Sequence, residues 1–499
     1  VYWLLKNIQK CSVSNSQKKR AVLYCGPSNK SVDVVAGHLL KLRNQLRPLR
    51  VYSDQMEMLE FPYPGCNLKL SRHSKRSEKP NTELSSIALH HLIRKEDNPF
   101  STQILAFDLK IARGDNLTNE EKRFYKDILQ KARKHELLQH DVILCTCTAA
   151  SNPALAKVLD FKQIIIDECA MATEPEAFIP LVAHKPDQIV LLGDHMQLQP
   201  VVHCDVVERL GMSKSLFERY MEKALMLDTQ YRMQEDICAF PSKEFYGGKL
   251  KTGTLPKPSL FLTKSKQTCI VFGHVDGKEK SLVVSTEQGN ENSKANVEES
   301  KNPKTPTNIS DISLKHASII DVHRDVIIVI IFLQVRIAIL LTKAGIKTKD
   351  IAILTPYNAQ VSNISQSLFS KGIRDITVNT IMKSQGSEWK YVIISTVRSC
   401  PESDIEKQPT KSWIIKCLGF IMDPHQVNVG ITRAQEGLCI IGNENLLRCS
   451  VLWRRLLDHY KEKGCVVNPA RHIQVQKPTR SLGKRELLED DVLHAVLFL

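Results

Sequence analysis

A short apolar strand that ends in two adjacent carboxylates is the feature that most constrains how this chain can fold. Residues 164–166 are three isoleucines, and Asp167 and Glu168 follow them directly. A second apolar run at residues 188–192 leads into the sequence GDHMQLQP at residues 193–200. Such runs are typical of buried parallel strands, whose carboxyl ends can hold Mg²⁺ beside nucleotide phosphates. The two runs therefore predict a parallel α/β sheet with a nucleotide site at one edge.

The same alternation of apolar strands and helical segments continues along the chain and predicts doubly wound parallel sheets. Further strand patterns lie at residues 21–25, 141–146, 351–354, 391–395 and 438–441. A chain of 499 residues is too long for a single core. We therefore expect an α/β fold with two parallel sheets in tandem.

The domain boundaries follow from shifts in composition. We expect a first domain over residues 1–245, a second over residues 246–455, and a carboxy-terminal tail over residues 456–499. A charged, loosely helical stretch at about 50–140 predicts a helical insertion in the first domain. A stretch at about 275–334, much of it rich in Ser, Asn, Lys and Glu, predicts an irregular or inserted segment in the second.

Charge and cysteine content narrow the class of partner and the compartment. The formal net charge is +15, from 69 Lys and Arg against 54 Asp and Glu, which favours a polyanionic partner. The 14 cysteines include no pair with zinc-knuckle spacing, which favours a reduced, intracellular protein. The apolar run 326–341 is interrupted by Gln334 and Arg336, and it is shorter than the roughly 20 residues of a membrane helix, so we expect no membrane partner.

Several further blocks occur in a fixed order: PSN at 27–29, TCTA at 146–149, LDTQYRM at 227–233, TPYN at 355–358, QGSE at 385–388 and NVGITRA at 428–434. With this order, over residues 21 to about 455, the chain resembles superfamily 1 helicases of the group that includes the RNA helicase of nonsense-mediated decay. The resemblance implies two RecA-like domains, ATP and Mg²⁺ as cofactors, and single-stranded nucleic acid as partner, with RNA favoured over DNA. It also implies protein partners in transcription or RNA decay, and a location in the nucleus or the cytoplasm.

The resemblance assigns catalytic roles to five residues: Asp167, Glu168, Gln197, Arg232 and Arg433. Asp167 can bind Mg²⁺ directly or through water, and Glu168 can orient and deprotonate the attacking water. The amide of Gln197 can donate to phosphate and accept from water, so hydrolysis would alter its hydrogen bonds. The guanidinium groups of Arg232 and Arg433 suit the charge that spreads over the phosphoryl oxygens in the transition state.

The resemblance also implies four cofactor-binding residues: Gln230, Tyr231, Gly386 and Glu388. Gly386 permits close approach of the backbone, and Glu388 can accept hydrogen bonds from ribose or from Arg433. Members of the family often carry a basic residue at the position of Gln435. Its replacement here predicts the loss of one phosphate or nucleic-acid contact.

Nucleic-acid contacts are expected from loops at the carboxyl edges of both sheets. The candidate residues are Pro27, Ser28, Asn29, Thr146, Thr355, Pro356 and Tyr357. Small hydroxyls and backbone amides suit sugar-phosphate contacts without base selection, and Tyr357 can stack on a base.

Each block also has a purely structural interpretation. An Asp-Glu pair can end a strand in a solvated turn, a glycine can mark a turn before a strand, and a lone arginine is usually a surface charge. At the level of function, the alternative is a non-catalytic nucleic-acid-binding or transcriptional coregulator scaffold built on the helicase fold. A nuclease is disfavoured, because no set of carboxylates clusters beyond Asp167 and Glu168.

Two features of the sequence do not fit an active helicase. The phosphate loop GxxxxGK followed by Ser or Thr is absent from the 499 residues, so we expect an amino-terminal truncation that starts just past this loop and a chain that is inactive as given. Residues 300–334 consist of a polar portion followed by an aliphatic run. At this position the family has only a short connection. We expect this segment to be a gene-model insertion, such as translated intron, against the alternative of a natural lineage-specific loop.

Overall fold

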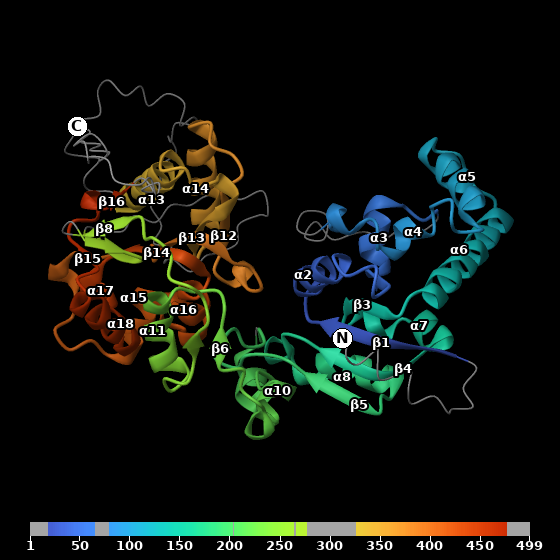
Figure 1. Cartoon of the computed structure of the whole chain (residues 1–499), viewed down its shortest axis with the longest axis horizontal. Helices are drawn as coiled ribbons and strands as arrows, with labels where there is room; N and C mark the ends of the chain where they lie inside the picture. Colours follow the sequence, from blue (N-terminus) through green and yellow to red (C-terminus); the bar gives the residue numbers. More distant parts are fainter. Residues whose placement is uncertain (1–17, 65–78, 203, 264–265, 277–325, 477–499) are drawn as a thin grey trace, which may run out of the picture. The chain divides into compact units, whose positions relative to one another are not determined.

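The computed structural model describes residues 18–64, 79–202, 204–263, 266–276 and 326–476. The chain divides into two compact units, Val1–Ala224 and Leu225–Leu499. Each unit is built around one sheet whose strands are all parallel (Figure 1). The predicted fold class, α/β with two tandem parallel sheets, is confirmed.

The first sheet has five strands in the order β2-β3-β1-β4-β5. They are β1 (Lys19–Gly26), β2 (Pro48–Arg50), β3 (Val142–Thr146), β4 (Leu159–Ile166) and β5 (Gln188–Leu191). Gly26 of β1 lies opposite Thr146 of β3, and Cys25 lies opposite Ile166 of β4. Because these three strands end level with one another, the loops that follow them leave from the same edge.

Helices cover both faces of this sheet, because the apolar residues of its central strands are buried on both sides. The helical elements outside the insertion are α2 (Asn29–Leu40), η2 (Ala149–Ser151), α7 (Pro153–Val158), η3 (Cys169–Met171), α8 (Glu174–His184), α9 (Asp205–Val207), η4 (Glu208–Met212), α10 (Leu216–Arg219) and η5 (Met221–Lys223).

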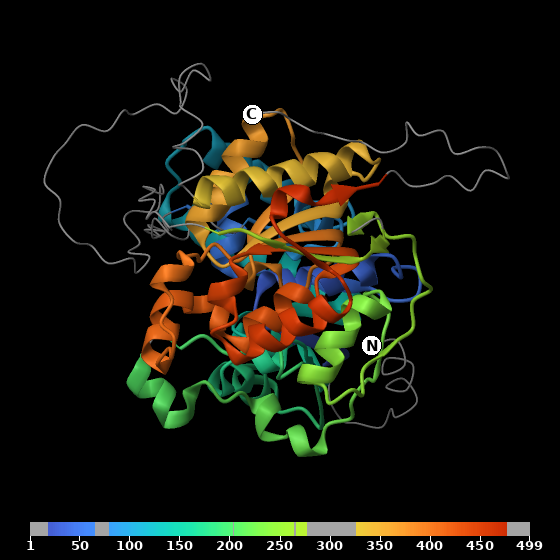
Figure 2. The ribbon, with the colours of Figure 1, turned by 90° about the vertical axis from the view of Figure 1, so that its left-hand side faces the viewer.

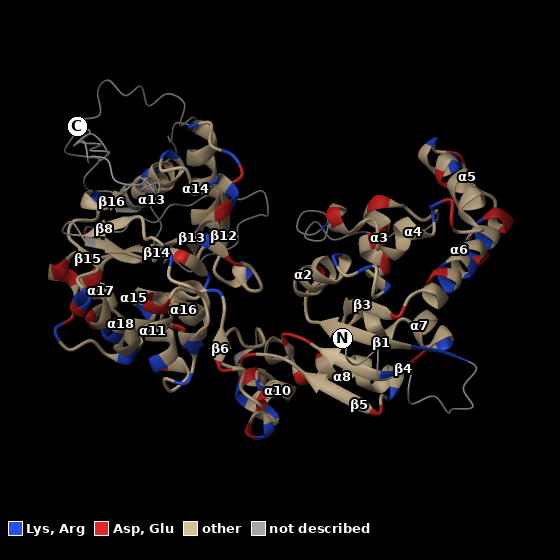
Figure 3. Cartoon of the chain, in the orientation of Figure 1, with Lys and Arg blue, Asp and Glu red and all other residues tan. Residues whose placement is uncertain are grey.

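The helical insertion expected at about 50–140 lies between β2 and β3. It contains α3 (Asp54–Glu60), η1 (Thr82–Leu84), α4 (Leu89–Leu92), α5 (Ser101–Ala112) and α6 (Asn119–Gln139). Helix α6 begins at a capping box in which Thr118 and Glu121 bond to each other's backbone N–H, and it buries Tyr125, Ile128 and Ala132. The rest of its surface carries charges of both signs (Figure 3).

The second sheet has six strands in the order β12-β11-β13-β14-β10-β15. They are β10 (Ile270–His274), β11 (Ile351–Thr355), β12 (Thr377–Thr380), β13 (Trp389–Ser395), β14 (Ala434–Gly442) and β15 (Val466–Val467). Two small sheets accompany it, made of β6 (Thr229–Gln230) with β7 (Lys251–Thr252), and of β8 (Phe261–Thr263), β9 (Lys266–Thr268) and β16 (Gln474–Val475).

Helices also cover both faces of the second sheet (Figure 2). One face carries α13 (Val326–Lys343) and α14 (Asn358–Ser370), whose apolar residues share a core with β11, β13 and β14. The other face carries α11 (Glu235–Phe245), α15 (Lys411–Leu418), α16 (Pro424–Ile431), α17 (Glu444–Leu447) and α18 (Val451–Glu462). Short helical turns connect these elements: η7 (Thr348–Asp350), η8 (Met382–Ser384), η9 (Glu402–Asp404), η10 (Gly419–Met422) and η11 (Ala470–His472).

The compact units differ from the expected domain boundaries in two places. The division falls after Ala224 rather than at residue 245, because α11 packs against α16 and β14 of the second unit. Residues 456–476 are not a separate tail, since they include β15 of the second sheet and β16, which pairs with β8. Residues 477–499 lie outside the described part of the chain.

The segment suspected of being inserted is only partly described. Residues 277–325 fall outside the described ranges, whereas residues 326–334 form the first half of α13 rather than an irregular loop. Buried apolar residues then continue at helical spacing through Ile337, Leu341 and Ala344, which pack on the sheet. Within the described ranges, no helix combines the length and the apolar character needed to cross a membrane.

Candidate functional site

The carboxylate of Asp167 is held at the edge where β1 and β4 end. The Asp167 backbone N–H donates to the Cys25 carbonyl at 2.8 Å, which extends the pairing of β4 with β1 by one residue. One Asp167 oxygen accepts from the Glu168 N–H at 2.8 Å, and the other accepts from the Tyr24 hydroxyl. Burial and the nearby Asp167 charge raise the pKa of Tyr24. Tyr24 was not predicted, because its place on β1 shows no local sign of this contact.

Glu168 turns the chain sharply at the end of β4. Its φ of 51° lies in the left-handed region, which costs a residue with a Cβ about 1–2 kcal/mol. The turn lets the Cys169 N–H donate to the Leu192 carbonyl at 2.8 Å, beyond the end of β5. A Cβ on Gly193 would lie 3.0 Å from the Ala170 backbone nitrogen, so glycine permits this close approach. The segments after β4 and β5 are therefore in direct contact.

Gln197 is positioned by Asp194 within the same unit. The Gln197 Nε2 donates to Asp194 Oδ2 at 2.8 Å, and the Met196 N–H donates to Asp194 Oδ1 at 3.0 Å. The structure thus places Asp167, Glu168 and the Asp194–Gln197 turn on neighbouring segments at one sheet edge. Asp194 had no assigned role, although its position after an apolar strand and a glycine was a usable signal.

Gln230 organises the turn that contains Tyr231 and Arg232. Its Oε1 accepts from the N–H groups of Arg232 and Met233 at 2.8 and 2.7 Å. Its Nε2 donates to the Met233 carbonyl at 2.8 Å and to Thr252 Oγ1 at 2.9 Å. The amide predicted to contact a cofactor is therefore engaged in fixing the turn, while Tyr231 is 75% exposed.

Arg232 and Gln435 both bind Glu388. The Arg232 Nε donates to Glu388 Oε2 at 2.6 Å, and the Gln435 Nε2 donates to Glu388 Oε1 at 2.9 Å. Partial burial acts to raise the pKa of Glu388, but the hydrogen bond and charge of Arg232 outweigh it, so the pKa lies below its usual value. Glu388, expected to accept from ribose or from Arg433, thus accepts from Arg232 and Gln435. Gln435, which replaces a basic residue, completes this cluster.

Arg433 is only 1% exposed and is bonded to backbone carbonyls. Its Nε donates to the Val429 carbonyl at 3.0 Å, and its Nη1 donates to the Ser387 carbonyl at 3.2 Å. It therefore ties α16 to the loop before β13. In that loop Gly386 has a φ of 74°, and a Cβ there would meet no atom within 4 Å, so the backbone conformation alone favours glycine.

Most predicted nucleic-acid residues of the first unit support local structure. Ser28 is the N-cap of α2, and Thr146 Oγ1 accepts from the Ala149 N–H at 3.2 Å. Asn29 Oδ1 accepts from the fully buried Arg50 at 2.9 Å. Pro27 is half-buried. These residues do share one sheet edge, as predicted, because β1 and β3 end level with each other.

The corresponding residues of the second unit follow β11. Thr355 is fully buried, and its hydroxyl has no hydrogen-bond partner among the described residues. Pro356 and Tyr357 are half-buried, and the Tyr357 ring centroid lies 6.0 Å from that of Phe420. Burial therefore makes Thr355 a poor candidate for direct contact in this conformation, whereas Tyr357 keeps an accessible part.

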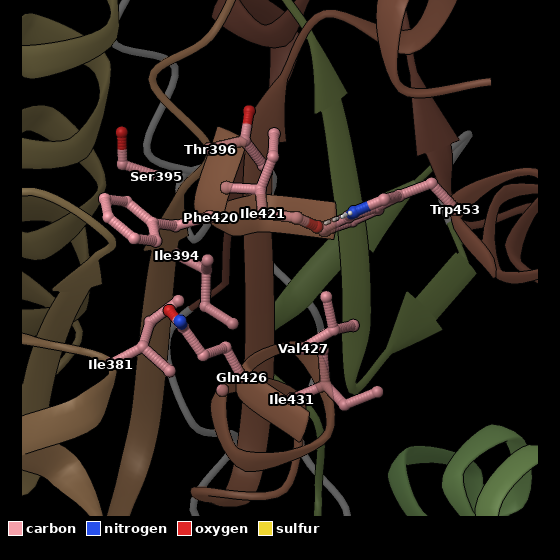
Figure 4. Close-up of a pocket in the computed structure, with 11 residues that line it drawn as sticks. Ile381, Ile394, Ser395, Thr396, Phe420, Ile421, Gln426, Val427, Ile431 and Trp453 are labelled. Atoms are coloured by element: carbon pink, nitrogen blue, oxygen red, sulfur yellow. Dashed lines mark hydrogen bonds between the residues drawn. The ribbon is translucent and has the colours of Figure 1, made fainter. Parts of the chain in front are cut away.

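A small pocket in the second unit lies beside these residues (Figure 4). It is lined mostly by aliphatic side chains of β13, η10 and α16, and Trp453 donates from Nε1 to the Ile421 carbonyl beside it at 2.6 Å. None of the described residues that line it is charged. The pocket therefore offers no cation to bind phosphate and no ionisable side chain for acid–base chemistry.

Comparison with known proteins identifies the class. Two family models, each described as an AAA domain, match residues 1–205 and 212–445. Together with the sequence relatives described next, these matches show that the chain belongs to the superfamily 1 helicases of the nonsense-mediated-decay group.

Several known proteins match more than nine tenths of this chain in sequence. It is 48% identical to the mouse protein "3'-5' exoribonuclease HELZ2" over 96% of this chain and 16% of that protein, and 51% identical to the human protein of the same name over 92% and 15%. It is 31% identical to the "Regulator of nonsense transcripts 1 homolog" of Neurospora crassa, over 91% of this chain and 36% of that protein. The chain thus spans about one sixth of the HELZ2 relatives.

Proposed function

We propose that this chain is the motor part of an ATP-dependent helicase that moves along single-stranded nucleic acid. The main support is that Asp167–Glu168 and Asp194–Gln197 lie on neighbouring segments at one edge of a parallel sheet, joined by the bond from the Cys169 N–H to the Leu192 carbonyl. Nucleotide-dependent proteins of open α/β fold bind their ligand at this edge. Membership of a helicase family is the second support.

In the first unit, the oxygen-rich side chains suit Mg²⁺, which prefers carboxylate, phosphate and water oxygens. Asp167 would hold Mg²⁺, through water as long as Tyr24 keeps its hydrogen bond. Mg²⁺ with ATP supplies the phosphoryl group and neutralises its charge. Glu168, whose carboxylate extends from a strained turn, would accept the proton of the attacking water, and Gln197 would bind phosphate on exchanging its bond to Asp194.

In the second unit, Arg232 is the better candidate for a phosphate-binding arginine. Its side chain keeps 29% exposure, and its partner Glu388 lies at the surface, so an incoming phosphate can compete for the guanidinium. Arg433 would have to leave the Ser387 carbonyl before it reached a phosphate. Its role in the described conformation is to position the loop of Gly386, and Gln230 positions Arg232 in the same way.

The partner is proposed to be single-stranded RNA rather than DNA. The net charge of +15 favours a polyanion, and one matched relative is named a regulator of nonsense transcripts. Loops after β1, β3 and β11 would contact the sugar-phosphate backbone, with Tyr357 stacking on a base. Protein partners in transcription or RNA decay belong to the same proposal.

Turnover also requires a phosphate loop, and no GxxxxGK string occurs in these 499 residues. We therefore expect the chain by itself to hydrolyse ATP poorly. A chimera in which a segment that carries a GxxxxGK loop is joined ahead of Val1 supplies this group. Its RNA-stimulated ATPase activity tests the proposal.

The decisive substitution in this chimera is Glu168→Gln. It should lower kcat by about 100-fold or more and change KM little, because a general base contributes about 10²–10⁴-fold to rate. The exposed Glu96→Gln in the same unit is the matched control and should retain full activity. Equal turnover in both variants would reject Glu168 as the base. RNA binding without hydrolysis by the unsubstituted chimera would favour the scaffold alternative.

A further inference from the structure

A second group of side chains with ligand chemistry lies in the helical insertion, apart from the residues of the motor. Glu60, at the end of α3, accepts at the same oxygen from Nε2 of His90 and Nε2 of His91, each at 2.8 Å. The three ligand atoms lie within 4.8 Å of one another. Two imidazoles and one carboxylate from two helices thus converge on one point.

The surrounding residues hold both imidazoles in place. The His90 ring packs edge-on against Tyr52, with centroids 5.6 Å apart, and Phe61 packs edge-on against both histidines. Arg94 donates to the His90 carbonyl at 2.6 Å, and its guanidinium lies 3.6 Å from the Phe61 ring centroid. A cluster fixed by its own packing loses little conformational entropy when it binds a ligand.

The cluster is closed on one side and open on the other. His90 is 1% exposed, whereas the side chains of His91 and Glu60 are 31% and 25% exposed. A small ion can therefore enter from solvent and keep a water molecule as a further ligand.

We propose that Glu60, His90 and His91 form a transition-metal site that takes Zn²⁺, with water in the remaining position. Two imidazole nitrogens and one carboxylate oxygen are a ligand set that Zn²⁺ takes in proteins. Tetrahedral Zn²⁺ with bonds of about 2.0–2.2 Å places neighbouring ligand atoms roughly 3.3 Å apart. The observed 2.8 Å separations need to widen by only about half an ångström, which rotation about side-chain bonds can supply.

The metal would act as a structural link at the base of the insertion. It would join α3 to α4, and Arg94 continues the connection by binding Asp108 of α5 with two hydrogen bonds of 2.7 and 3.2 Å. Since neither α3 nor α4 exceeds seven residues, little within these helices fixes their mutual placement. Bound Zn²⁺ should therefore raise the melting temperature of the chain.

The test is to count Zn²⁺ bound to the full 499-residue chain under reducing conditions, by mass spectrometry after equilibrium dialysis. Cysteines elsewhere can also bind zinc, so the informative quantity is the difference between variants. His91→Ala removes one ligand. Glu60→Gln keeps the size of the side chain and removes its charge, which provides a second variant if His91→Ala does not fold. His38→Ala, an exposed histidine on α2, is the matched control.

The unsubstituted chain and the His38→Ala variant should each bind one more equivalent of Zn²⁺ than the His91→Ala and Glu60→Gln variants. Affinity at this site should fall by more than about 100-fold in the two site variants, because even indirect partners of a metal typically contribute 10–100-fold. Zn²⁺ should raise the melting temperature of the first pair only. Equal binding by all four chains would show that Glu60 merely accepts hydrogen bonds from two histidines, and would overturn the proposal.

Discussion

Hydrogen bonds within the protein engage several polar residues that the sequence had suggested as ligand contacts. Gln230 makes four such bonds, Asn29 accepts from buried Arg50, and Arg433 donates to two backbone carbonyls. Breaking such bonds has a cost, since a buried polar group left without a partner loses about 1–3 kcal/mol. A ligand that contacts these positions must therefore replace an existing hydrogen-bond partner. Glu168 and Arg232, by contrast, keep part of their surface exposed to solvent.

Tyr24→Phe tests how much the hydroxyl contributes at Asp167. The substitution removes one hydrogen bond to a carboxylate and should lower the free energy of unfolding by about 1–2 kcal/mol, because Asp167 can recover part of the loss from water. Chemical denaturation measures the change. Tyr220→Phe, in the same unit and 50% exposed, should change it by less than about 0.5 kcal/mol. Equal effects would show that the hydroxyl bond adds nothing to stability.

The Glu388 cluster predicts a stability that depends on pH. A folded-state pKa below the usual value means that ionised Glu388 stabilises the fold above its unfolded pKa of about 4.3, and that this contribution is lost as pH falls through the lower folded value. The stability gap between the unsubstituted chain and Glu388→Gln should therefore narrow as pH falls from about 6 to about 3. The exposed Glu406→Gln should show no such trend in denaturation curves. A gap that widened with acid would contradict the assigned direction.

The sequence predicted which residues come together in the site better than it predicted the hydrogen bonds that hold them. The acidic and amide side chains of Asp167, Glu168 and Gln197 come together because parallel strands end at one edge, which apolar runs reveal. Tyr24 reaches Asp167 only through strand register, which leaves no pattern in sequence, whereas Asp194 follows an apolar strand and a glycine and could have been found. Likewise, Glu388 binds Arg232, which is 156 positions away in sequence, so no local rule identifies this pair.

At the scale of elements, strands with an uninterrupted apolar run were predictable and strands without one were not. β4, β13 and β14 contain predicted runs, because each carries three or more consecutive buried apolar residues. β10 contains a glycine and a histidine, and β15 has two residues, so neither has a distinctive pattern. Their places in the sheet come from tertiary pairing with β14 and with each other.

Gly386 provides a test of the loop before β13. At both Gly386 and Gly37, a Cβ would meet no atom within 4 Å, so backbone conformation alone decides whether alanine stabilises or destabilises the fold. Gly386→Ala places a Cβ at a φ of 74° and should destabilise by about 1–2 kcal/mol. Gly37→Ala lies inside α2 and should stabilise by roughly 0.5–1 kcal/mol. Thermal unfolding of both variants measures this, and a stabilising Gly386→Ala would contradict the described loop.

At the scale of the whole molecule, the two units carry different parts of the proposed chemistry. The carboxylates and Gln197 lie in the first unit, whereas Arg232, Glu388 and Arg433 lie in the second. The expected domains predicted this distribution for every residue except Arg232, which precedes the expected boundary at residue 245. The packing of helices and strands determines the boundary between the units. Helix α11 precedes the expected boundary at residue 245, yet it packs on α16 and β14.

The charge of the whole chain predicts how it binds nucleic acid. With a net charge of +15, binding to single-stranded RNA should weaken linearly on a log–log plot against salt, by about 0.7 per neutralised phosphate, with little preference among sequences. Lys383 is exposed in the turn after β12, where the Ile381 N–H bonds to the Thr355 carbonyl at 3.0 Å. We therefore expect Lys383→Ala to reduce the magnitude of the slope by about 0.7.

Lys343→Ala is the matched control, because this exposed lysine ends α13 and precedes β11, near the amino ends of the strands. Fluorescence anisotropy with labelled oligouridine, oligoadenosine and the matching DNA, at four or more salt concentrations, gives the slopes. A slope that changes equally in both variants would place the RNA elsewhere than at the carboxyl edge of the second sheet. Binding that is independent of salt would show that contacts other than phosphate neutralisation hold the strand, because counterion release accompanies every phosphate contact made by a cation.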